Sequence, residues 1–111
     1  MDEKLPKILY IDDEEWNLTA FRFMFRDEFE VMTAADTDTA ENILNEHLDI
    51  DVVISDQRMP DETGVQFFER MQHRLSTTER IILTGYSDID AVIGAINRAG
   101  VYFYLRKANL C

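Results

Sequence analysis

Five polar residues stand where their side chains could act together on a phosphoryl group. Asp12 and Asp13 follow one apolar run, Asp56 ends another, Thr84 ends a third, and Lys107 comes just after a fourth. Carboxylates that lie close together repel each other by about 4 kcal/mol per pair at an effective dielectric constant near 20. Such a cluster therefore favours a bound cation. Oxygen ligands without sulfur or imidazole favour Mg²⁺, with Mn²⁺ as the alternative.

The chemistry that this set favours is phosphoryl transfer onto a carboxylate. The metal and the ammonium group of Lys107 would offset charge on the phosphoryl oxygens, and the Thr84 hydroxyl would donate a hydrogen bond to one of them. Each residue alone carries little information, because an acidic pair after a strand is often only a helix cap. The joint pattern, in this order along the chain, is specific.

The elements that must position these residues alternate between strands and helices. Short apolar runs predict five strands, and apolar residues at helical spacing predict four helices. Pro60, Asp61 and Gly64 predict a turn directly after Asp56. The predicted strands are Lys7–Ile11, Phe29–Ala34, Val52–Asp56, Arg80–Thr84 and Val101–Leu105. The first predicted helix covers 14–26 and the third covers 65–74. The second begins at a cap formed by Asp36 or Asp38, and its inward residues are Ala40, Ile43, Leu44 and Leu48. The fourth covers 87–100, and its inward residues are Ile89, Val92, Ile93 and Ile96.

This alternation predicts an α/β fold, a doubly wound five-stranded parallel sheet with helices on both faces. The expected strand order is 2-1-3-4-5, in which the first and third strands flank the switch point. The carboxyl ends of parallel strands point the same way. We therefore expect Asp12, Asp13, Asp56, Thr84 and Lys107 to gather at one edge of the sheet.

Length and composition set further bounds. A chain of 111 residues that is 46% hydrophobic predicts one folded domain with its own core. The net charge of −11 disfavours direct binding to nucleic acids and to anionic membranes. The single cysteine, Cys111, excludes an internal disulfide and fits a reducing cytoplasm. We expect no transmembrane helix and no signal peptide, because no apolar run is long enough and the start is charged.

Across its whole length the chain resembles the receiver domain of bacterial two-component response regulators. The matching motifs are Ile11-Asp12-Asp13, Ser55-Asp56 with Met59-Pro60 and Gly64, Leu83-Thr84-Gly85, and Tyr104-Leu105-Arg106-Lys107. The resemblance implies that Asp56 accepts a phosphoryl group from the phosphohistidine of a sensor histidine kinase or a phosphotransfer protein. The domain would then phosphorylate and dephosphorylate itself as a cytoplasmic signalling module, not as a turnover enzyme.

The resemblance also implies a role for each site residue. Asp12, Asp13, Asp56 and the backbone carbonyl of Arg58 would serve the Mg²⁺ site, with Asp12 acting directly or through water. Thr84 and Lys107 would contact the phosphoryl group. After phosphorylation Thr84 would swing inward and Tyr104 would follow, which rearranges the face formed by the fourth helix and the fifth strand.

The sequence departs from the family pattern in two places. Ala108 follows Lys107 where the family usually has proline, and a cis bond there would cost roughly 3 kcal/mol. Only four residues follow Lys107, so we expect residues 1–111 to form a single receiver domain that stops after the fifth strand, without the fifth helix. That absence would uncover apolar surface on the first helix, around Trp16 and Phe23, for a second copy or another partner to cover.

Arg58 and Tyr86 each lie two residues after a site residue. In the family these positions border the phosphorylated aspartate, so two bulky side chains there predict slow loss of the phosphoryl group.

Three alternative functions remain open at this point. A pseudo-receiver used only for protein contacts is the main one, although the complete set of acids, hydroxyl and lysine argues against it. A phosphatase of the haloacid-dehalogenase-like type would place Asp-x-Asp after its first strand, where this chain has adjacent aspartates. A flavodoxin-like cofactor binder would carry a phosphate loop there in place of acids. No output segment can be identified.

Overall fold

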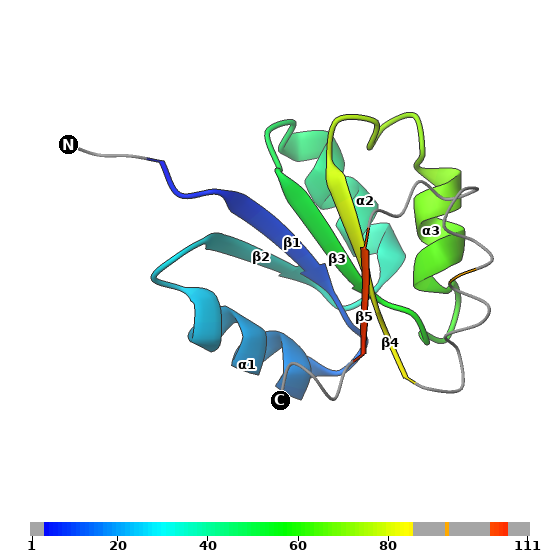
Figure 1. Ribbon diagram of the computed structural model, residues 1–111, viewed down its shortest axis with the longest axis horizontal. Coiled ribbons are helices and arrows are strands. Elements are labelled where there is room, and N and C mark those ends of the chain that lie inside the picture. The colour runs from blue at the N-terminus through cyan, green and yellow to red at the C-terminus, as the bar shows by residue number, and fades with distance from the viewer. Residues whose placement is uncertain (1–3, 86–92, 94–102, 107–111) are drawn as a thin grey trace.

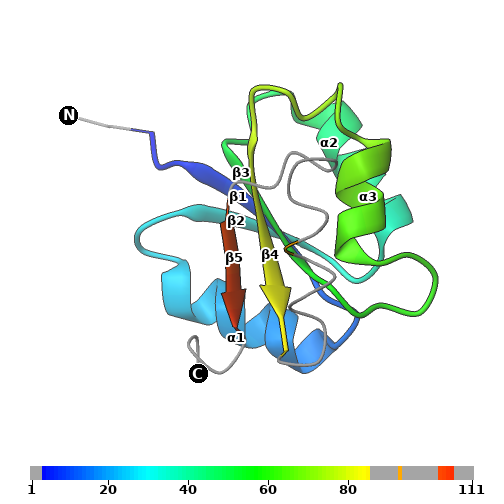
Figure 2. The ribbon, with the colours of Figure 1, turned by 45° about the vertical axis from the view of Figure 1, so that its right-hand side comes forward.

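The computed structural model describes residues 4–85, Ile93 and residues 103–106, the last four by their backbone only. The strands are β1 (Lys7–Ile11), β2 (Glu30–Ala34), β3 (Val52–Asp56), β4 (Glu79–Thr84) and β5 (Phe103–Arg106). The helices are α1 (Glu15–Phe25), α2 (Thr37–Glu46) and α3 (Gly64–Arg70). All four strand pairings are parallel, in the order β2-β1-β3-β4-β5 (Figures 1 and 2). The predicted fold class and strand order are confirmed.

The helices cover both faces of the sheet, with α1 on one side and α2 and α3 on the other (Figure 1). Because side chains alternate across a strand, β1, β3 and β4 each contribute to two cores. The core under α1 contains Ile8, Tyr10, Leu18, Ile54 and Leu83. The core under α2 and α3 contains Leu9, Ile11, Ala40, Leu44, Val53, Phe67, Phe68 and Ile82. This arrangement holds the sheet from both sides and fixes where the strand ends lie.

Local signals explain where the helices begin. The Asp36 carboxylate accepts a hydrogen bond from the Thr39 backbone N–H at 2.7 Å, so Asp36 is the N-cap of α2. Thr63 and Gln66 form a capping box at the start of α3. The sequence pattern left Asp36 and Asp38 open as the cap of α2, and the structure selects Asp36.

Two predicted inward positions are wrong. Leu48 is 79% exposed because α2 ends at Glu46 and the extended backbone at His47 turns the chain away from the helical face. Ile93 is helical but 49% exposed. The rest of the predicted 87–100 helix and the segment after Arg106 lie outside the described residues. In the described part of the chain, no helix is long and apolar enough to cross a membrane.

Candidate functional site

The strand ends bring Asp12, Asp56 and Thr84 to one edge of the sheet. In the observed register Ile11 lies opposite Ser55, Asp56 opposite Leu83, and Thr84 opposite Arg106. Asp12 directly follows β1, while Asp56 and Thr84 are the last residues of β3 and β4. The parallel register thus gathers side chains from three strands at the carboxyl edge, where open α/β sheets bind their ligands.

Asp12, Asp13 and Asp56 form a compact group of acids. One carboxylate oxygen from each lies within 4.8 Å of the others. Asp12 is fully buried and Asp56 is 3% exposed, whereas Asp13 is exposed. Two buried carboxylates beside a third are costly unless a cation or hydrogen-bond donors compensate their charge. Three oxygen donors with one side toward solvent fit Mg²⁺, which prefers oxygen ligands and retains waters. The donor set therefore suits the metal that the sequence predicts.

Three donors hold the buried Asp12 carboxylate. The Tyr10 hydroxyl donates to its Oδ2 at 2.8 Å, the Asn17 side-chain amide donates to the same oxygen at 3.0 Å, and the Glu14 backbone N–H donates to Oδ1 at 3.0 Å. These bonds fix the carboxylate in one orientation and offset the cost of burying it. Neither Tyr10 nor Asn17 was predicted from the sequence. Tyr10 lies two residues before Asp12, and this spacing could have predicted the contact because residues i and i+2 point to the same face of a strand.

The loop after Asp56 is fixed at its start by the buried residue Gln57. Its N–H donates to the Leu83 carbonyl at 2.9 Å, and its own carbonyl accepts from the Gly64 N–H at 3.1 Å. Its side-chain oxygen accepts from the Val65 N–H at 3.0 Å. One residue therefore joins β3, β4 and the first turn of α3. This role was not predicted either, because it depends on partners from three elements.

Gly64 packs against the peptide of the predicted phosphoacceptor. A Cβ atom at this position would lie 2.6 Å from the Asp56 carbonyl oxygen, 2.8 Å from Ile82 Cδ1 and 3.0 Å from Ser55 Oγ. The Ser55 hydroxyl donates to the same Asp56 carbonyl at 2.9 Å. Glycine is thus required here for close approach between α3 and β3. The sequence pattern had indicated only a turn at Gly64.

The remaining predicted residues occupy different surroundings. Thr84 is 1% exposed, and its hydroxyl donates to the Gly85 carbonyl at 3.2 Å. Arg58 is exposed. The Tyr104 backbone lies opposite Ile82 in the sheet, but its side chain lies outside the described residues. Lys107, Tyr86 and Ala108 lie outside them as well; Arg106, the residue before Lys107, pairs with Thr84.

A pocket of about 600 Å³ opens beside the acidic group. Asp13 lines it from the loop after β1, and Met59, Pro60, Asp61 and Glu62 line it from the loop after β3. Asp36 and Asp38 contribute two more carboxylates, and Arg70 contributes a cation. The pocket therefore joins the acidic group to the loop between β3 and α3.

A family model for the response regulator receiver domain matches residues 8–109. The hydrogenase transcriptional regulatory protein HoxA of Cupriavidus necator is 36% identical over 107 residues, which cover 96% of this chain and 22% of that protein. The alginate biosynthesis transcriptional regulatory protein AlgB of Pseudomonas aeruginosa is 31% identical, with 95% of this chain and 23% of that protein covered. The chain thus spans about a fifth of the length of these relatives.

Solved structures agree with this assignment. A response regulator receiver domain protein from Clostridium thermocellum superposes with a TM-score of 0.86 at 38% identity, covering 93% of this chain and 82% of that one. The chemotaxis protein CheY4 of Vibrio cholerae gives 0.83 at 29% identity, covering 93% and 87%. Since the family model spans nearly the whole chain, a relative is 36% identical over 96% of it, and a solved receiver domain shares its fold, this chain belongs to the response regulator receiver domain family, whose members are signalling modules of two-component systems.

Proposed function

We propose that Asp56 accepts a phosphoryl group from the phosphohistidine of a sensor histidine kinase or phosphotransfer protein, in a reaction that requires Mg²⁺. The supporting observation is the group of Asp12, Asp13 and Asp56, whose oxygens lie within 4.8 Å of one another at the carboxyl edge of the sheet. Acceptance of a phosphoryl group is general to the receiver family. A cytoplasmic location, where a kinase would deliver the group, fits the single cysteine.

In the proposed reaction a carboxylate oxygen of Asp56 attacks the phosphorus atom of phosphohistidine. The P–N bond breaks as the P–O bond forms, and the imidazole leaves and takes up a proton. Asp12, Asp13, Asp56 and the Arg58 carbonyl would hold Mg²⁺, which when bound offsets charge on the phosphoryl oxygens. Tyr10 and Asn17 keep the Asp12 carboxylate oriented during the transfer.

Thr84, Lys107 and Tyr104 carry the proposed switch. The Thr84 hydroxyl now donates to the Gly85 carbonyl, so it must exchange that acceptor for a phosphoryl oxygen once Asp56 is modified. Lys107 would supply a positive charge to the same group. Tyr104, on the strand beside β4, would follow Thr84 and change the face formed by the fourth helix and β5. HoxA and AlgB are named as transcriptional regulatory proteins, and both are several times longer than this chain. We therefore propose control of transcription as the output, exerted through a longer protein.

Arg58 and Tyr86 are proposed to slow hydrolysis of the acyl phosphate by shielding Asp56 from water. Arg58 is exposed at the start of the loop after β3, two residues beyond Asp56. Replacing both residues with alanine should shorten the half-life of the phosphorylated form, followed by intact mass over time. An unchanged half-life would refute the shielding role.

A second copy of the chain is the proposed partner for the exposed face of α1. Trp16 is 80% exposed and Phe23 is 66% exposed, two helical turns apart and opposite the buried Leu18. Glu15 lies at the beginning of one flank of this face, and Arg22 lies on the same flank near its end. Two antiparallel copies related by a two-fold axis would therefore place opposite charges side by side.

Sedimentation at about 0.15 M salt tests this contact. Phe23→Asp should convert the dimer to a monomer, whereas Leu48→Asp, on a comparably exposed apolar residue elsewhere, should leave it unchanged. A wild-type chain that stays monomeric at high concentration would overturn the proposal, as would equal disruption by both variants. The second result would place the contact on another surface.

Intact mass after incubation with Mg²⁺ and acetyl phosphate tests the proposed phosphoryl transfer. The wild type should gain one phosphoryl group, the Asp56→Asn variant should gain none, and EDTA should abolish the gain. The alternative function is a pseudo-receiver that only contacts other proteins. A folded wild-type chain that binds no Mg²⁺ and gains no mass would favour that alternative.

A further inference from the structure

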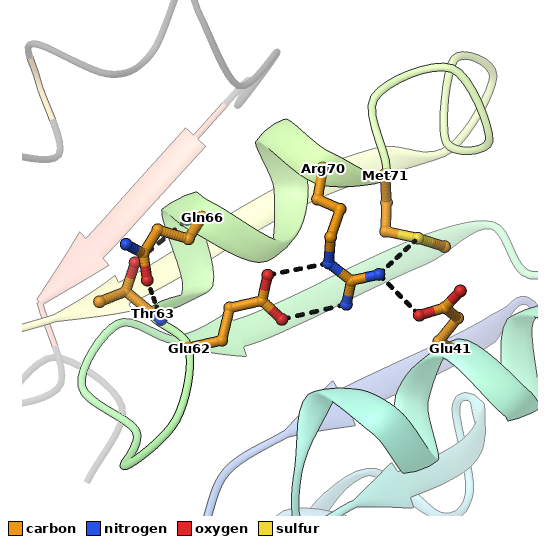
Figure 3. Close-up of polar contacts among 6 residues, drawn as sticks. All are labelled: Glu41, Glu62, Thr63, Gln66, Arg70 and Met71. Atoms are coloured by element: carbon orange, nitrogen blue, oxygen red, sulfur yellow. Dashed lines mark hydrogen bonds and ion pairs between the residues drawn. The ribbon is translucent and has the colours of Figure 1, made fainter.

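A single guanidinium group joins the loop after β3 to two helices (Figure 3). Arg70, the last residue of α3, donates from Nε to Glu62 Oε2 at 2.9 Å and from Nη2 to Glu62 Oε1 at 3.0 Å. Its Nη1 donates to Glu41 Oε1 of α2 at 2.6 Å. The same guanidinium lies over the Phe67 ring, with 5.3 Å between Cζ and the ring centroid. Arg70 therefore ties its own helix and the loop before it to α2, whose Glu41 lies 29 residues earlier in the chain.

This contact closes the far end of a loop whose near end is already fixed. Gln57 anchors the loop at β3 through its bonds to Leu83, Gly64 and Val65. At the other end the Thr63 N–H donates to the Gln66 side chain at 2.9 Å, and the bidentate pair holds Glu62. Residues 58–61 are held between these anchors, so the ion pair helps to set the course of the loop that contains Arg58.

The loop faces the acidic group across the pocket. Asp13 lines that pocket together with Met59, Asp61, Glu62 and Arg70. A shift of the loop would thus change the surroundings of Asp13 and the position of the Arg58 carbonyl.

We infer that Arg70 is a positioning residue for the metal site, which holds the loop that supplies the Arg58 carbonyl. This inference rests on the proposed Mg²⁺-dependent function. The Arg70–Glu62 ion pair lies outside the acidic group, and it would affect the affinity for the metal through the backbone of the loop.

The ion pair between Arg70 and Glu62 persists at neutral pH because both groups remain charged. The hydrogen bond from Arg70 is the main cause that lowers the pKa of Glu62 below its ordinary value of 4.5. The pKa of Arg70 is raised, chiefly by its hydrogen bond to Glu62. Both partners therefore stay ionised throughout the neutral range.

Arg70 could instead act only through its charge, and the two roles predict opposite effects. As a cation in a pocket with Asp13, Asp36 and Asp61, it would weaken the attraction for Mg²⁺, so its removal would tighten binding. As a positioning residue it would strengthen binding, so its removal would weaken it. Lysine separates these roles further, because its ammonium group keeps the charge but cannot make the bidentate contact.

Calorimetric titration of Mg²⁺ into Arg70→Lys, Arg70→Gln and Glu62→Gln tests the inference. We expect the Kd of all three variants to rise by about 10-fold, the lower end for groups that orient metal ligands. Arg74→Lys is the matched control. Arg74 also contacts α2, through the Leu44 carbonyl, but it is not among the residues that line the pocket. Hydrogen exchange of the backbone amides of residues 58, 59, 61 and 62 should also quicken in Arg70→Lys and stay unchanged in the control.

The outcomes distinguish failure of the inference from failure of the proposed function. If the wild type binds Mg²⁺ and Arg70→Lys binds it with the same Kd, the inference is refuted and the proposed function is not. Tighter binding by Arg70→Gln would assign Arg70 a purely electrostatic role and overturn it as well. A folded wild type that binds no Mg²⁺ would refute the proposed function, and the inference with it. If Arg70→Gln does not fold, Arg70→Lys still decides, because it keeps the charge and loses only the bidentate contact.

Discussion

Replacement of Gly64 by alanine is the sharpest test of how α3 and β3 meet beside the predicted phosphoacceptor. The new Cβ would lie 2.6 Å from the Asp56 carbonyl oxygen and 2.8 Å from Ile82 Cδ1. Real Cβ atoms essentially never approach other atoms within 3.0 Å, so the backbones must separate by at least 0.4 Å. The obstacle is a backbone atom, which cannot rotate away as a side chain would.

The cost follows from how tightly α3 is held. Phe67 and Phe68 are completely buried on the next turn of α3, so the helix cannot withdraw without opening the core. Overpacking of this kind costs about 1–3 kcal/mol, and a clash with a backbone atom places Gly64→Ala at about 3 kcal/mol. For a domain of this size that loss should lower Tm by about 10 to 20 °C. It should lower the urea midpoint by about 1 to 3 M.

Urea denaturation followed by far-UV circular dichroism measures this loss. Fluorescence is less suitable, because Trp16 is largely exposed in the folded state and reports little of its unfolding. Gly85→Ala is the matched control, since Gly85 is exposed and, among the residues that the structure describes, none other than its chain neighbours has an atom within 4 Å of the position that a Cβ would occupy there. That variant should be as stable as the wild type or slightly more stable. Equal stability of Gly64→Ala and Gly85→Ala would refute the close-contact argument.

Three further predictions concern the cap of α2 and the acidic group. Asp36→Ala should cost about 1 kcal/mol by removing the cap, whereas Asp36→Asn should keep it. The bond to the Thr39 N–H lowers the pKa of Asp36, so the extra stability that its negative charge adds should be complete above the ordinary value of 3.8. That extra stability should be lost as the pH falls through the lower folded-state value, as urea denaturation at several pH values would reveal. Tyr10→Phe should raise the Kd for Mg²⁺ by about 10-fold in calorimetry; an unchanged Kd would show that the other donors to Asp12 suffice. Mg²⁺ at about 100 times its Kd should raise the free energy of unfolding by about 2.7 kcal/mol, and Asp13→Asn should lose most of that gain at the same concentration.

Much of the fold and the acidic group could be predicted because they follow from local patterns. Apolar runs that alternate with helical segments predict a parallel sheet, and in such a sheet all carboxyl ends meet at one edge. That rule alone brings Asp12 and Asp13 together with Asp56, although more than forty residues separate them. The errors at Leu48 and Ile93 arose where an apolar residue was assigned to a core face by spacing alone.

The sequence by itself determined the alternation of strands and helices, the residue types at the strand ends and the chemistry that those types favour, because each depends on periodicity and charge. The strand order was predicted from the known order of doubly wound folds, not from periodicity. Only the tertiary structure decided which groups hold them in place. Tyr10 and Asn17 orient Asp12, Gln57 joins two strands to a helix, and Arg70 links Glu62 to Glu41. Such contacts join residues from different elements, and their geometry depends on how those elements pack, which no local pattern encodes.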